Sequence, residues 1–331
     1  MNLQSEVKSG ASLLREAANI AGRRSLLASA LLFSIVASQP SMASSASQAA
    51  AAAQPAAPAA QPVSVGVNLN ITPKRLTLNR GQRSATVYIF NQGKTPATFD
   101  IAMVDRIMLP SGDILPVTDA RTPEQKGVAD KLKSAQSMVL ATPRRATLAP
   151  GKGQTVRLRV VPAAGAEAAE YRSHLTVTTV PPRNVGLTAE DAAAQKTDQL
   201  SFQVTSVFGL SIPVIIRSGA AQASAEIRKP RLSYVDLSPD GVAPPRRTPV
   251  LALELGRTGP NSLFGNVEIR SKGKEPIGMI RGVGVYTEID QRTVQIPLQR
   301  APAPGEQLEI VFVDDDLTPG RVITRSSLTA P

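Results

Sequence analysis

Few residues in this chain could carry out catalytic or metal chemistry. The sequence has no cysteine and a single histidine, His174, which excludes disulfides, thiolate nucleophiles, Cys-ligated zinc and multi-His metal sites. The run Asp314–Asp316 could chelate a hard cation, but it lacks the spacing of a calcium loop, so a charged turn is the better interpretation. Gly282–Gly284 lacks the third glycine of a nucleotide-binding loop. The sequence therefore predicts a protein that is not an enzyme and that uses no metal and no other cofactor.

A different kind of chemistry, recognition by an extended strand, is indicated by the run Leu200–Arg217. Its even positions are large and apolar except Ser206, and its odd positions are mostly small or polar, which is the period of a β-strand. At about 3.3 Å per residue the run extends beyond ~50 Å, longer than one sandwich needs. It could be a core strand followed by a second strand. Alternatively, part of its apolar row lies beyond the chain's own core and inserts into another protein's groove by β-augmentation.

The elements that would position this run are short strands. From Val63 onward, short alternating runs are separated by Pro, Gly and Asn, a texture typical of antiparallel β-sandwiches. Only 123–140 and the polar loop 188–196 could keep a helical period. The fold class is therefore all-β. The predicted strands are 65–71, 84–90, 97–104, 155–161, 175–180, 200–217, 249–255, 267–270, 279–289, 308–313 and 321–324.

The N-terminal segment has the organisation of a secretory signal peptide. Basic residues precede the apolar run Leu26–Ala37, and the small residues Ser41 and Ala43 follow it. As a helix this run rises about 18 Å, short of the roughly 30 Å of a membrane's hydrocarbon layer. We expect residues 1–43 to be a signal peptide cleaved after Ala43, so that the mature protein is exported.

The mature chain divides into a linker and two domains. Residues 44–62 contain only Ser, Ala, Gln and Pro and should form a flexible linker. The remaining length suits two domains, which we place at 63–218 and 219–331.

The charge balance of the chain is basic. It carries 37 Lys and Arg against 26 Asp and Glu, a net charge of +11. Such a balance could indicate nucleic acid, an anionic membrane or an acidic partner. The basic residues are scattered along the sequence with few aromatic residues among them, so nucleic acid is not an expected partner.

At this point the sequence resembles the PapD-like periplasmic chaperones of the chaperone–usher pathway. The likeness covers about residues 65–218, and the second half matches only as a sandwich of the right size. The most specific match is Pro143–Gly151 followed by Gln154–Leu158, which resembles the family's P-x-x-x-x-L-x-P-G…Q-x-V-R signature. The other matching stretches are Thr72–Leu78 with Ser84–Asn91, Glu170–Leu175 with Val180–Pro182, and Leu200–Arg217 at the place of the family's long G strand.

The resemblance implies two immunoglobulin-like β-sandwich domains and a mechanism. The first domain's G strand would be donated into the groove of an incomplete pilin or fimbrial subunit, which is then delivered to an outer-membrane usher for fibre assembly. By position, the subunit-binding residues would be Phe202, Val204 and Phe208, with Ser206 a weak member of the row. The free protein could self-associate to cover this edge. No nucleic acid and no small-molecule cofactor is implied.

The resemblance also implies an anchor for the subunit's terminal carboxylate. Arg75 matches the family's Arg position, but the family's Lys position is Pro213 here, which supplies neither a charge nor a backbone donor. Arg172 could substitute, or the terminus could be held differently. The family commonly has a glutamate just before the serine of its F strand, and this position is Arg172 here. The family's interdomain salt bridge, which would involve Arg217, could therefore run through Glu170 instead.

Two other readings stay open. The protein could be a non-catalytic structural or adhesive component of the envelope that keeps the chaperone-like fold without shuttling subunits. It could also be an exported sandwich that binds carbohydrate or peptide, although no aromatic platform supports that function.

Overall fold

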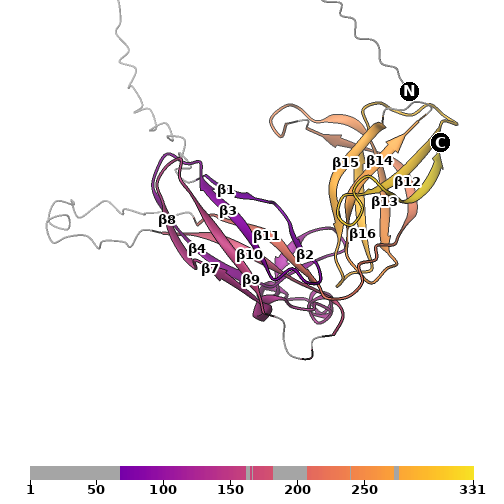
Figure 1. Ribbon diagram of the computed structural model, residues 1–331. Helices are drawn as coiled ribbons and strands as arrows, with labels where there is room; N and C mark the ends of the chain where they lie inside the picture. Colours follow the sequence, from indigo (N-terminus) through magenta and orange to yellow (C-terminus); the bar gives the residue numbers. More distant parts are fainter. Residues whose placement is uncertain (1–67, 162–164, 166, 182–206, 239, 272–275) are drawn as a thin grey trace, which may run out of the picture. The chain divides into compact units, whose positions relative to one another are not determined.

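The computed structural model describes residues 68–331, apart from 162–164, 166, 182–206, 239 and 272–275 (Figure 1). The predicted signal peptide and linker therefore lie outside the described residues, as does the polar loop 188–196. Pro62–Pro331 form one compact unit. Among the described residues, no helix has the length and apolar character needed to cross a membrane.

The first sandwich consists of two sheets. One sheet has the strand order β1 (Leu69–Thr72), β3 (Ser84–Asn91), β9 (Gly153–Val160) and β7 (Val139–Thr142). The other has the order β2 (Leu76–Leu78), β11 (Gly209–Arg217), β10 (Glu170–Val180), β4 (Ala97–Val104) and β8 (Arg145–Leu148). All pairings are antiparallel except that of β2 with β11, which is parallel.

Alternation of apolar and polar residues builds the core of the first sandwich. From Val87 in β3 and from Val156 in β9, every second residue is buried, as expected for strands with one face toward a core and one toward water. Phe99 on β4 and Leu175 on β10 complete the same core from the opposite sheet, both with 0% of their surface exposed. The Asn91 side chain ends β3 by donating to the carbonyls of Thr95 and Leu148.

The second sandwich also has two sheets. Their orders are β12 (Ala225–Leu237), β13 (Arg246–Arg257) and β16 (Gln291–Pro297), and β15 (Pro276–Val285), β14 (Leu263–Arg270), β17 (Gln307–Asp314) and β18 (Val322–Thr329). Leu253, Val267 and Phe312 lie in its core. The all-β class with two immunoglobulin-like sandwiches, predicted from the sequence, is confirmed.

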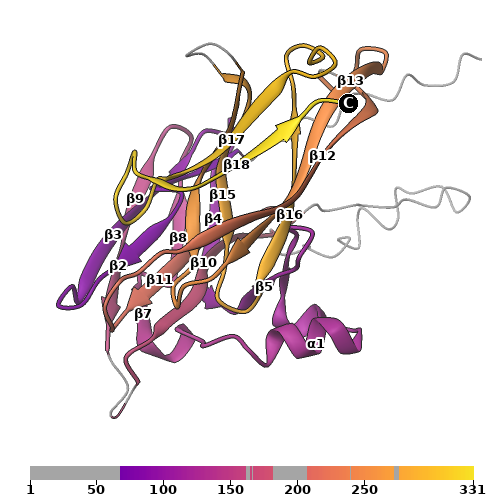
Figure 2. The same cartoon turned by 90° about the vertical axis from the view of Figure 1, so that its right-hand side faces the viewer.

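Residues 105–138 connect β4 to β7 within the first sandwich, and part of this segment packs against the second sandwich. They contain the hairpin β5 (Arg106–Met108) and β6 (Ile114–Pro116), the 3-10 turns Val117–Asp119 and Gln136–Met138, and helix α1 (Pro123–Ala129). Helix α1 begins with a capping box between Thr122 and Gln125 and lies beside β5 (Figure 2). Met108 is buried in the core of the second sandwich, and its backbone N–H donates to Glu288.

The sequence predicted some elements wrongly. The helix expected within 123–140 ends at Ala129, and the strand expected over 279–289 ends at Val285. The strands β12 and β16 were not predicted at all. In β12 the alternation is interrupted at Lys229, which has a positive φ of 47°, and the pairing register shifts at this point.

Candidate functional site: the β11 edge and the interdomain arginines

Strand β11 is paired along one edge and only partly along the other. Its pairing with β10 runs from Glu170↔Arg217 to Thr178↔Gly209, and it continues at Phe208, which exchanges two hydrogen bonds with Thr179. On the second edge, β2 pairs only with Val214–Ile216. Within the described part of the chain, no strand pairs with this second edge before Val214.

The open edge results from the path of the first strands. β1 is paired with β3 in one sheet, and the chain then crosses to the other sheet, where β2 is paired with β11. Leu69–Thr72, which precede β2, therefore pair with β3 and do not continue along β11. Unpaired N–H and C=O groups on such an edge can accept another strand.

The apolar row of β11 leaves the chain's own core at the same point. Ile212, Val214 and Ile216 are at most 6% exposed and belong to the core of the first sandwich. Leu210 is 38% exposed and Phe208 is 43% exposed. The even-numbered side chains are therefore split between an inner half that stabilises this protein and an outer half that contacts solvent.

The predicted subunit-binding residues are only partly described. Phe208 lies on the open part of the row, whereas Phe202, Val204 and Ser206 lie outside the described residues, so their role stays a prediction. Leu210 extends the exposed row but was not singled out from the sequence, because its exposure depends on where β2 stops.

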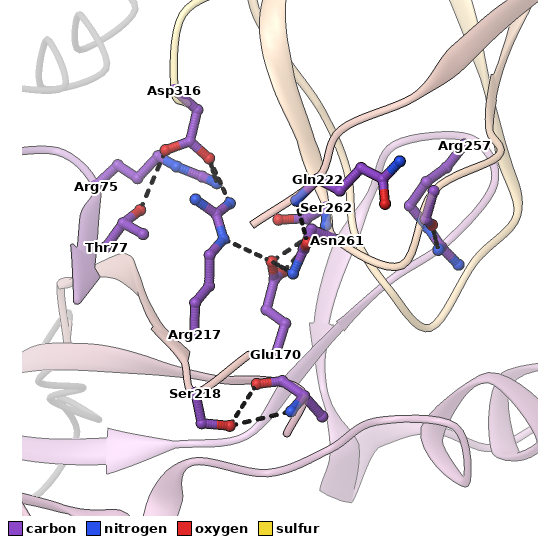
Figure 3. Close-up of polar contacts among 12 residues, drawn as sticks. Arg75, Thr77, Glu170, Arg217, Ser218, Gln222, Arg257, Asn261, Ser262 and Asp316 are labelled. Atoms are coloured by element: carbon purple, nitrogen blue, oxygen red, sulfur yellow. Dashed lines mark hydrogen bonds and ion pairs between the residues drawn. The ribbon is translucent and has the colours of Figure 1, made fainter. Parts of the chain in front are cut away.

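A buried ion-pair network links β11 to the second sandwich (Figure 3). Arg217 Nε donates to Glu170 Oε2 at 2.9 Å, and Arg217 Nη2 donates to Asp316 Oδ2 at 2.6 Å. The Arg217 and Glu170 side chains are each 1% exposed. Asn261 and the backbone N–H of Ser262 also donate to Glu170. The Arg217 salt bridge does run through Glu170, and Asp316 extends it to the second sandwich.

Asp316 is held in place by the loop after β17. Asp314 accepts hydrogen bonds from the backbone N–H groups of Asp316 and Thr318, so the run Asp314–Asp316 forms a charged turn. Burial alone would raise the pKa of Asp316, but the hydrogen bond from Arg217 and the charge of Arg75 outweigh burial and lower it. Among the described residues there is no cluster of acidic or histidine side chains suited to a metal ion.

Arg75, the predicted carboxylate anchor, shares this acidic partner. Its Nη2 donates to Asp316 Oδ2 at 2.9 Å, and its guanidinium carbon lies 4.5 Å from the centroid of the Phe264 ring, a cation–π distance. Its side chain is 12% exposed. Its Nε and Nη1 atoms are buried and have no partner among the described residues. Arg75 is thus fixed in place while two of its nitrogens keep their capacity to donate.

Arg172 does not suit the role of substitute for the missing lysine. Its guanidinium is ion-paired with Glu288, donates to the carbonyl of Arg106 and lies 4.0 Å from the centroid of the Tyr286 ring. Arg172 is 1% exposed and Glu288 is 0% exposed at the side chain. The charge of Arg172 is therefore enclosed and used to join the two sandwiches.

Positive charge nevertheless gathers opposite Pro213. The register pairs Pro213 with His174, whose pKa is lowered to about 2 by burial and then by the charges of Arg172, Arg106 and Arg75. Among the described residues, Arg106 makes no ion pair, and its buried Nε has no partner. Arg106 could not be identified from the sequence, because only the β5–β6 hairpin brings it near His174.

Comparisons with known proteins identify chaperones among solved structures. No family model and no curated protein matches the sequence. The chain is similar to the E. coli chaperone DraB, with a TM-score of 0.41, 12% identity, and coverage of 80% of this chain and 97% of that one. It is also similar to the chaperone–tip adhesion subunit complex CsuC–CsuE of Acinetobacter baumannii chaperone–usher pili (TM-score 0.37, 15% identity, 80% and 98% covered). A third similar structure is the Salmonella enterica SafA pilin in complex with the SafB chaperone, with a TM-score of 0.38, 13% identity, and coverage of 79% of this chain and 96% of that one.

These structures belong to the class of protein that the sequence motifs resemble. Their TM-scores are below 0.5.

Proposed function

We propose that this protein is a non-catalytic periplasmic chaperone that binds incomplete pilin or fimbrial subunits by lending them β11 and the residues before it. The observation that carries this function is the division of β11, in which the open edge coincides with the exposed half of its apolar row. A guest that lacks one strand would gain backbone hydrogen bonds from the edge and apolar contacts from the row. The guest would then pass to an outer-membrane usher.

The donated residues are Phe202, Val204, Ser206 and Phe208, with Leu210 added from the structure. Each large apolar side chain that enters a guest's groove contributes on the order of 1.5–3 kcal/mol. Release occurs by exchange with the strand of another subunit, so no nucleotide is needed. Export by the N-terminal signal peptide places the protein in the compartment where such subunits arrive.

The anchor for the guest's terminal carboxylate is Arg75, assisted by Arg106. Guanidinium groups bind carboxylates through strong charge-assisted hydrogen bonds. Both arginines retain buried nitrogens without a partner in the described residues, and both act on His174 opposite Pro213. Arg106 would thereby supply the second positive charge that Pro213 cannot.

Co-expression with a candidate pilin, followed by affinity capture, tests the donation. We expect Phe208→Glu with Leu210→Glu to abolish the complex, because two charges would enter the guest's apolar groove. Val207→Glu is the matched control, since Val207 is the adjacent residue, is 56% exposed and lies at an odd position of the run. An unaltered yield of complex from the double variant rejects strand donation.

A second function is favoured by Pro213 at the usual lysine position. The protein could be a structural or adhesive envelope component that keeps this fold and holds no subunit carboxylate. Stable co-purification with cell-surface material, together with no capture of a candidate pilin by the wild-type protein, would favour this function over the first.

A further inference from the structure

The outward side of the β1–β3–β9–β7 sheet forms a continuous surface, here called the basic face. The inward residues of its strands, such as Val87 and Leu158, are buried, so their neighbours face outward. The register places the outward residues in four rows: Leu140, Arg159 and Ser84; Thr142, Arg157 and Thr86; Thr155, Tyr88 and Thr72; Gly153, Phe90 and Asn70.

Large apolar and aromatic side chains lie on this face. Tyr88 is 46% exposed, and Leu140 is 48% exposed. The Tyr88 and Phe90 rings stack with centroids 6.3 Å apart. A Cβ atom on Gly153 would lie 2.2 Å from Tyr88 Oη, which shows that the tyrosine lies across this glycine. The face thus holds a fixed, solvent-exposed aromatic pair.

The charged residues of these strands and of the loops directly beside them are all positive. From Leu69 to Phe99 and from Met138 to Val161 the sequence contains no Asp and no Glu. Arg157 and Arg159 lie in the rows, and both are exposed. The loops that flank these strands add Arg80, Arg83 and Lys152, which are also exposed. The residues are scattered in sequence, but the register collects them on one side of the sandwich.

The arginines of the basic face are also unpaired. Within the described part of the chain, neither Arg157 nor Arg159 makes an ion pair. On the second sandwich, several cations pair with carboxylates of their own sheet, as in Arg228–Glu226, Lys229–Glu254, Arg270–Glu268 and Arg325–Glu309. The basic face, in contrast, presents its cations without carboxylate partners, so its positive field is open.

We propose that the basic face docks on the surface of an anionic phospholipid bilayer. Lys and Arg side chains near such a surface are attracted to its negative potential. Arginine stems and tyrosine rings have an apolar body and a polar end, which suits the boundary between headgroups and acyl chains. An acidic protein would satisfy the arginines alone, whereas a bilayer surface accommodates the cations together with Tyr88, Phe90 and Leu140. Docking here leaves the β11 edge available for a guest.

Vesicle co-sedimentation with the purified protein tests this proposal. We expect binding to vesicles of phosphatidylcholine mixed with phosphatidylglycerol and none to phosphatidylcholine alone. Binding should weaken with added NaCl, because the Debye length falls from about 10 Å at 0.1 M to about 3 Å at 1 M. Removing both charges with Arg157→Gln and Arg159→Gln should lower the partition coefficient about 30-fold, which corresponds to about 1 kcal/mol per arginine, and the two Glu replacements should lower it further.

The matched control is Arg246→Glu with Arg247→Glu, two exposed arginines at the start of β13 on the second sandwich. This variant has the same change in charge as Arg157→Glu with Arg159→Glu, and it should bind vesicles as the wild type does. Tyr88→Ser should weaken binding that persists at high salt. Equal losses in both double variants, no binding to anionic vesicles, or capture by a polyglutamate peptide without vesicle binding would each overturn the proposal. Pilin capture is measured in parallel, so that failure of this proposal is distinguished from failure of the chaperone function.

Discussion

The two halves of β11 share one sequence pattern but differ in edge pairing and in side-chain burial. From Val214 to Ile216 the strand is paired on both edges, and it ends in the buried Arg217. From Phe208 to Leu210 it is paired on one edge, and its apolar side chains contact solvent. One alternating run thus serves two purposes, because the place where β2 stops decides whether a side chain stabilises this protein or is available to another.

The largest expected effect is on the inner half. Arg217→Ala would leave Glu170 and Asp316 as buried carboxylates without their shared cation, and we expect a loss of about 3–5 kcal/mol in the free energy of unfolding. Denaturant unfolding measures it. Arg145→Ala, which breaks the ion pair with Asp100 on exposed side chains, should change the free energy of unfolding little, because water screens the two charges. Equal losses from both variants would contradict the contrast between a buried and an exposed pair.

A second prediction compares apolar residues on either side of the division. Ile212→Ala should cost about 2–5 kcal/mol because Ile212 is buried in the core. Phe208→Ala should cost no more than about 1 kcal/mol, since much of its ring is already in water. Thermal unfolding distinguishes the two variants. A large destabilisation by Phe208→Ala would mean that the outer half also belongs to the chain's own core.

The smallest effect is a pH dependence at the boundary, where His174 lies opposite Pro213. In the folded protein the pKa of His174 is lowered to about 2, whereas an unfolded chain protonates histidine near pH ~6.5. The unfolded state therefore binds more protons below that pH, and stability falls as the pH drops, by up to about 1.4 kcal/mol per unit. Between pH 6.5 and 5, His174→Gln should show a flatter slope than the wild type. Equal slopes of stability against pH in the wild type and in His174→Gln would contradict the lowered pKa of His174.

The sequence predicted those parts of the site that depend on local pattern. The row of β11 is visible because its period of two persists along the run, and Glu170 was identified as an alternative partner of Arg217 by its place near Arg172. The partnership of Arg217 with Asp316 could not be predicted, since it joins two sandwiches through a loop whose position depends on their packing.

Other features were hidden for physical reasons. β12 was missed because Arg228, Lys229 and Pro230 interrupt its alternation at a register shift. Arg106 was missed because a hairpin carries it to His174. The basic face was missed because outward residues of different strands are distant in sequence and become neighbours only through the strand register.

Hydrogen–deuterium exchange of β11, with and without a bound pilin subunit, tests the central claim most directly. Both halves are read from the same strand in one experiment. The Phe208 backbone faces β10, so the N–H groups of Gly209 and Ser211 face the open edge. We predict that these two amides become protected when the subunit binds, while those of Val214–Ile216, where β11 already has a partner strand on both edges, keep their exchange rates. Unchanged exchange at Gly209 and Ser211 in a complex that demonstrably contains the subunit would contradict the donation of this strand.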